Sequence, residues 1–106
     1  YKLRESKMEW HFPRERIREH QRIVIYGAGD MGRSFIKQIA ENHYCRVILW
    51  VDKNYEKLGS AVHAPNDIVK CDFDYVLVAI FDEQVSKKVS DYLIGLGVAE
   101  NKILLM

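Results

Sequence analysis

The chain has 106 residues, of which 48% are apolar, so it is long enough for one domain with its own core. Its 16 basic and 15 acidic residues leave a formal net charge of +1, which gives no electrostatic reason to expect binding to nucleic acid or to an anionic membrane surface. The longest apolar runs are much shorter than a membrane span, and no apolar signal-peptide core stands near the first residue. The two cysteines, Cys45 and Cys71, do not form a disulfide framework and indicate reduced thiols in a cytoplasmic protein.

The first part of the chain differs in pattern from the rest. Residues 1–21 are charged and irregular, with an aromatic cluster at residues 10–12. We expect a short helix over residues 13–20, since the proline that opens this stretch suits a first helical turn. We interpret residues 1–21 as a lead-in segment and residues 22–106 as the domain. Because the chain starts at Tyr1 and stops directly after an apolar run, we also expect the domain to be excised from a longer polypeptide.

From residue 22 onward, apolar strands alternate with amphipathic helices. Continuous apolar runs rich in β-branched residues are typical of strands buried on both faces, and apolar residues at helical spacing follow two of these runs. In chain order we predict a strand at 22–26, a helix at 30–42, a strand at 46–51, a loop at 54–59, a short strand at 61–63, helical turns at 65–70, a strand at 73–80, a helix that starts after Asp82 and ends at Gly95 or Gly97, and a final strand at 102–106.

This alternation predicts the α/β class, with a parallel sheet and helices on its faces. Right-handed crossovers are expected between the strands. We expect the strand order 3-2-1-4-5, in which the third strand, at residues 61–63, is short or missing.

A glycine-rich loop joins the first strand to the first helix. It reads Gly27-Ala28-Gly29-Asp30-Met31-Gly32. In this context Gly27 permits a tight turn, Gly29 lets a diphosphate approach the backbone, and Gly32 lets the helix pack closely on the strand. The helix N-terminus then favours an anion. The loop predicts a Rossmann-like three-layer sandwich, a minimal doubly wound sheet that binds a nucleotide.

An acidic residue ends the second strand. Asp52 lies 20 residues beyond Gly32, where a carboxylate would accept hydrogen bonds from ribose hydroxyls. A ribose 2′-phosphate would meet like charge there, so NAD or a plain nucleoside diphosphate is favoured over NADP, although Lys53 next to it could soften this preference. We place the ligand across the carboxyl ends of the strands, where Ala79 and Ile80 end the 73–80 strand.

Asp30 leaves two interpretations of the loop open. Its charge lies inside the loop, where it would repel a diphosphate. Arg33 could offset this charge by reaching a phosphate, or it could be a solvated helix residue. In the alternative interpretation Asp30 caps the helix, and the loop is a purely structural feature that binds no ligand.

The sequence offers little for catalysis or metal binding. The four histidines have no metal-ligand spacing with each other or with the cysteines. Asp72 and Asp74 flank Phe73 and are either a catalytic pair or polar residues before a buried strand. We find no Ser-His-Asp arrangement, no Walker loop and no convincing general base. Three functions therefore stay open: a nucleotide-binding module, a hydride-transferring enzyme without a substrate domain, and a structural assembly module.

The motifs also carry a family resemblance. The runs at residues 23–29, 50–54 and 74–80, with Leu58-Gly59 and Pro65, resemble small Rossmann-like domains of bacterial surface-polysaccharide biosynthesis proteins. These include N-terminal domains of nucleotide-sugar dehydratases and epimerases, of sugar acyltransferases, and domains fused to glycosyltransferases.

The resemblance implies that the glycine loop and the acid after the second strand hold NAD or a UDP-sugar, which carries over to Gly27, Gly29, Gly32 and Asp52. The sugar acyltransferase domains usually have Gly-His where this chain has Asp30-Met31, so that branch fits less well. The expected partners are a nucleotide ligand and the remaining domains of a longer polypeptide, with a homodimer left open. Turnover is not expected from this chain alone.

Overall fold

A computed structural model describes residues 10–106, so the first nine residues of the expected lead-in lie outside it. The elements are strands β1, β2, β3 and β4, helices α1 and α2, and three short 3-10 helices, η2, η3 and η4. Their bounds in chain order are β1 Arg22–Tyr26, α1 Asp30–Asn42, β2 Arg46–Val51, η2 Tyr55–Lys57, η3 Pro65–Lys70, β3 Tyr75–Val78, α2 Glu83–Leu96, η4 Glu100–Lys102 and β4 Ile103–Leu105.

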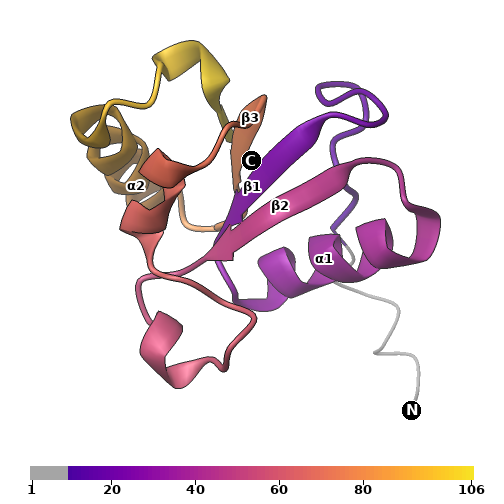
Figure 1. Cartoon of the computed structure of the whole chain (residues 1–106), viewed down its shortest axis with the longest axis horizontal. Helices are drawn as coiled ribbons and strands as arrows, with labels where there is room; N and C mark the ends of the chain where they lie inside the picture. Colours follow the sequence, from indigo (N-terminus) through magenta and orange to yellow (C-terminus); the bar gives the residue numbers. More distant parts are fainter. Residues whose placement is uncertain (1–9) are drawn as a thin grey trace.

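The four strands form one parallel sheet in the order β2-β1-β3-β4. Helices α1 and α2 lie on opposite faces of this sheet (Figure 1). The arrangement confirms the predicted α/β, Rossmann-like three-layer fold. Its strand order is the expected one with the third strand missing, because residues 61–63 contribute only a single bridge between Val51 and His63.

The two faces of the sheet bury two separate apolar clusters. Successive residues of a strand point to opposite faces. Accordingly Ile23 and Ile25 of β1 pack with the apolar side of α1, whereas Val24 packs with residues that include Leu93 of α2. All four of these side chains are fully buried. This burial on both faces explains why the strands read as unbroken apolar runs.

The termini of α2 follow the predicted signals. The Asp82 carboxylate accepts hydrogen bonds from the backbone N–H groups of Gln84 and Val85, at 2.9 and 3.2 Å, and thereby caps the helix. The helix ends at Leu96, and Gly97 follows it with a φ of 106°. Glycine adopts this left-handed conformation without the steric cost that other residues carry.

The helix predicted over residues 13–20 is wrong. The segment forms turns and a bend, in which the N–H groups of Arg16 and Ile17 share one acceptor, the Pro13 carbonyl. The Tyr44 hydroxyl donates to the Ile17 carbonyl at 2.7 Å and ties the segment to the connection between α1 and β2. Ile17 is fully buried and belongs, with Phe12, to the apolar cluster on the α1 face of the sheet, so the described part of the lead-in packs into the core.

No helix within residues 10–106 combines the length and the apolar character that crossing a membrane requires.

Candidate functional site

The glycine loop lies at the carboxyl end of β1, between the ends of β2 and β3. The N–H of Gly27 donates to the Val51 carbonyl at 2.8 Å, which ties the loop to β2. Gly27 has a φ of +122°, and a Cβ there would lie 2.7 Å from the Ala79 carbonyl oxygen. Both the conformation and the space therefore require glycine.

The other two loop glycines face different surroundings. A Cβ at Gly32 would overlap the carbonyl oxygen of Gly27, so α1 packs directly against the loop only because this residue has no side chain. A Cβ at Gly29 would meet no atom within 4 Å. The fold therefore needs Gly32 but does not need Gly29, and the open space beside Gly29 is where the glycine motif predicts a diphosphate.

Helix α1 begins with unpaired backbone donors. Its N-cap is Gly29, which has no side chain to cap the helix. Among residues 10–106, no hydrogen-bond acceptor faces the N–H groups of Gly29, Asp30 or Met31. Such N–H groups, together with the helix dipole, attract an anion.

Asp52 is held by the backbone on both of its oxygens. Oδ2 accepts from the N–H of Ala28 at 2.8 Å, and Oδ1 accepts from the N–H of Asn54 at 2.8 Å. The half-buried carboxylate thus shapes the glycine loop and the turn that follows β2. Each carboxylate oxygen has a second lone pair, so hydrogen bonds from ribose hydroxyls stay compatible with these contacts.

Asp30 does not cap α1, so the alternative interpretation is wrong where it makes Asp30 the helix cap. It is the first residue of the helix, its side chain is 81% exposed, and its carboxylate lies 3.7 Å from the guanidinium of Arg33. Solvent screens both charges at such exposure. Arg33 thus pairs with Asp30, while Lys53 is exposed and does not line the hollow at the loop.

A surface hollow of about 380 Å³ gathers most of the predicted site. The predicted residues that line it are Gly27, Gly29, Asp30, Met31, Asp52, Ala79 and Ile80. Ala28 and Gly32 also belong to the loop, but they are buried and do not line the hollow. Two further residues, Trp10 and Phe81, also line the hollow and were not predicted. Phe81 directly follows Ala79-Ile80, so its position after a buried strand was a usable signal, whereas nothing in the sequence connects Trp10 to the loop.

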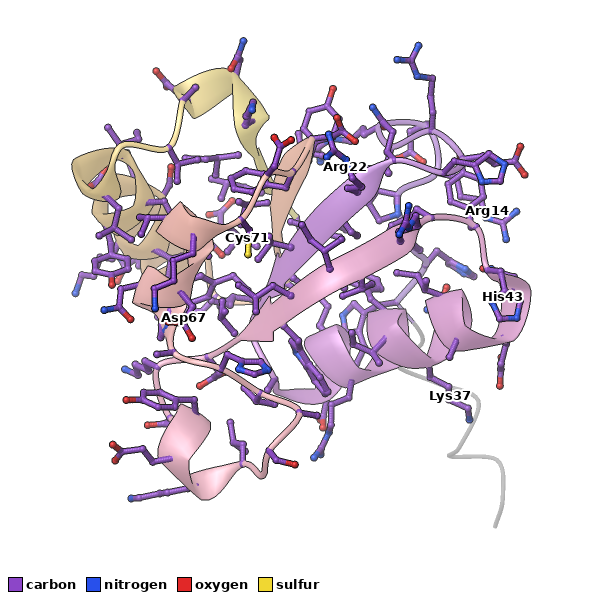
Figure 2. All side chains as sticks on the ribbon, in the orientation of Figure 1. Arg14, Arg22, Lys37, His43, Asp67 and Cys71 are labelled. Atoms are coloured by element: carbon purple, nitrogen blue, oxygen red, sulfur yellow. The ribbon has the colours of Figure 1, made fainter. Side chains whose placement is uncertain are left out.

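Asp72 and Asp74, considered above as a catalytic pair, do not lie at the glycine loop. Asp72 and Asp74 bond the guanidinium of Arg22 at 3.1 and 3.6 Å, and Asp74 also accepts from the N–H of Arg22 at 2.8 Å. Figure 2 shows Arg22 at the start of β1, at the end of the sheet away from the glycine loop. The aspartates therefore fix the entry of β1 and take no part in the loop site.

Neither metal ligation nor a reactive thiol is indicated near the loop. Within residues 10–106 no group of three or more His, Cys, Asp or Glu side chains is arranged to hold a metal ion. Both cysteines are free thiols, and burial raises the pKa of Cys45 to about 11, which keeps it protonated at neutral pH. Burial also raises the pKa of Tyr26 to about 12, with smaller contributions from Tyr92 and Asp52.

Four parallel strands with a glycine loop at the central crossover define a Rossmann-type α/β domain. The chain belongs to the family described as C2185-like, N-terminal, which it matches over residues 19–104. Comparison with curated protein sequences gives no match. Among solved structures, the chain is similar to UDP-D-quinovosamine 4-dehydrogenase from Vibrio fischeri, with 20% identity, a TM-score of 0.61, and coverage of 82% of this chain and 78% of that one. At this identity the likeness establishes the fold.

Proposed function

We propose that this domain binds a nucleotide at the glycine loop, with NAD as the first candidate and a nucleoside-diphosphate sugar as the second. The observation that carries the proposal is a single hollow that brings together the loop residues with unpaired N–H groups and the carboxylate of Asp52. The diphosphate would bind at Gly29 to Met31, and the ribose would bind at Asp52.

The resemblance in fold adds a second kind of support. The structural neighbour is named as a dehydrogenase of a UDP-sugar, so its name includes a nucleotide sugar. We infer that the present domain serves a larger polysaccharide-biosynthesis protein, to which it contributes nucleotide binding while other domains supply the reacting groups.

One observation favours a competing function. The Ala28 N–H and both oxygens of Asp52 already have partners within the chain, so this part of the loop is satisfied without a ligand. A module that uses the fold only for assembly would show the same contacts.

Calorimetry and thermal unfolding with NAD, NADP, UDP and UDP-N-acetylglucosamine separate the two functions. A ligand that binds only the folded chain stabilises it by about 2.7 kcal/mol at a hundredfold excess over its Kd. We expect NAD to bind more tightly than NADP, because the 2′-phosphate would meet Asp52. The absence of binding and of stabilisation by every nucleotide would refute the proposal and favour the assembly module.

A further inference from the structure

We propose that Trp10 and Phe81 form an aromatic subsite for the ring that a nucleotide carries beyond its diphosphate. The inference rests on the proposed nucleotide binding and extends it. The ring is the nicotinamide of NAD or the hexose of a nucleotide sugar, and both present a flat or apolar face to an aromatic side chain.

Phe81 is unusual for its exposure. The residue is 76% exposed, more than any other large apolar residue described within residues 10–106. It lies between the end of β3 and the Asp82 cap of α2, where the chain is fixed on both sides. A phenylalanine exposed in this way gives the fold little hydrophobic stabilisation. It lines the hollow together with Trp10, and ligand pockets are typically lined by aromatic side chains.

Trp10 is held in place by a separate set of contacts. The amide of Gln38 on α1 donates to the Trp10 carbonyl at 2.6 Å, and its oxygen accepts from the N–H of Phe12 at 3.2 Å. Phe12 is buried and packs edge-to-face on Phe35, with ring centroids 5.6 Å apart. These contacts fix the backbone on both sides of His11 and hold the half-buried Trp10 at the loop.

The two aromatic residues connect the loop hollow to a second one. This second hollow has a volume of about 620 Å³ and shares Trp10, Met31 and Phe81 with the first. It continues past α2 to Met106, which follows β4. A ligand with its ribose at Asp52 and its diphosphate at the loop would therefore extend its second half over Trp10 and Phe81, across the carboxyl ends of the strands.

The charges around the second hollow limit what enters it. Asp82 and Glu83 line it, and among residues 10–106 no Lys or Arg does. An additional phosphate is therefore disfavoured, whereas a neutral hexose or the positively charged nicotinamide of oxidised NAD is compatible. A position lined by aromatic and acidic residues suits the cationic ring best.

The test compares ligands with and without this ring, and the NAD pair is the cleaner one because UDP also has an additional negative charge on its terminal phosphate. Calorimetry would measure NAD against ADP-ribose, and UDP-N-acetylglucosamine against UDP, for the unmodified chain and for Trp10→Ala and Phe81→Ala. Stacking on aromatic side chains makes the ring-bearing member of one pair bind about tenfold or more tightly. Both substitutions should remove that advantage, and the affinity for ADP-ribose or UDP should fall by a much smaller factor. The pair that shows the effect identifies the ring as nicotinamide or hexose.

Val69→Ala supplies the matched control, since Val69 is 57% exposed and lines a different hollow. It should change no affinity. Equal losses for both members of a pair, or no loss in Phe81→Ala, would overturn the aromatic subsite while leaving nucleotide binding in place. If no nucleotide binds the unmodified chain, the proposed function fails first and this inference fails with it.

Discussion

Gly29→Ala separates what the fold requires from what a ligand would require. A methyl group at this position meets no atom within 4 Å, and the backbone has a φ of −82°, which alanine adopts without strain. The free energy of unfolding should therefore be unchanged or higher by up to about 1 kcal/mol, since alanine reduces the conformational entropy of the unfolded chain. The same methyl group would occupy the space through which a diphosphate reaches the N–H groups of α1.

The expected loss of affinity follows from those N–H groups. A hydrogen bond to a charged acceptor contributes about 1.5–3 kcal/mol, so the loss of one such contact weakens binding by about tenfold to a hundredfold. Gly32→Ala should behave in the opposite way. Its Cβ overlaps the Gly27 carbonyl and forces α1 away from the loop, which costs about 1–3 kcal/mol or more of folding stability.

Urea unfolding would measure the stabilities, and calorimetry with NAD would measure binding. Gly95→Ala is the matched control, because it lies within α2 with no atom within 4 Å of its Cβ. It should stabilise the chain by about 1 kcal/mol and leave the affinity unchanged. Full NAD affinity in Gly29→Ala would show that no diphosphate binds beside this residue, and a loss of folding would refute the reasoning from open space.

Two further predictions concern charge and pH. Asp30→Asn should tighten diphosphate binding by about twofold to fivefold at low salt, since it removes an exposed negative charge beside the loop, and calorimetry should find the gain reduced at 1 M salt. An unchanged affinity at low salt would contradict this. Burial raises the pKa of Tyr26 from 10 to about 12, so the folded chain favours the neutral phenol. The contribution of this preference to folding stability is complete below pH 10 and is lost as the pH rises through 12. Unfolding curves at pH 9 and pH 11.5 should show a smaller fall in stability for Tyr26→Phe, and an equal fall would exclude this cause.

The sheet and both long helices were predictable because their signals are local. A strand buried on both faces must be apolar at nearly every position, as residues 22–26 are. Helix α1 shows its buried face as a helical spacing of apolar residues, and its bounds match the prediction. The predicted strand at 73–80 was too long, since β3 spans only Tyr75–Val78. Ala79 still donates its N–H to the Tyr26 carbonyl, and Ala79 and Ile80 line the hollow at the loop.

Two features were not predicted, the turns at residues 13–20 and the position of Trp10, and each depends on contacts between residues far apart in the chain. Residues 13–20 form turns instead of a helix, and the Ile17 carbonyl accepts from Tyr44, 27 residues away, a contact that no local pattern shows. Trp10 reaches the loop only because Gln38 holds its backbone. Local periodicity indicates which face of an element is buried, but it does not indicate which distant segment covers that face.

Asp52 illustrates why the residue pattern alone could not decide between a binding loop and a structural one. An acid after the second strand is expected if it binds ribose, and it is equally expected if it holds the Ala28 N–H in place. Asp52→Ala would leave that N–H without its acceptor, so lost affinity and lost loop geometry would be confounded. Gly29 is free of this ambiguity, because no contact within the described chain requires a glycine there. Gly29 is therefore the loop glycine at which a substitution tests for a ligand, because packing alone explains the two glycines that the fold could not replace.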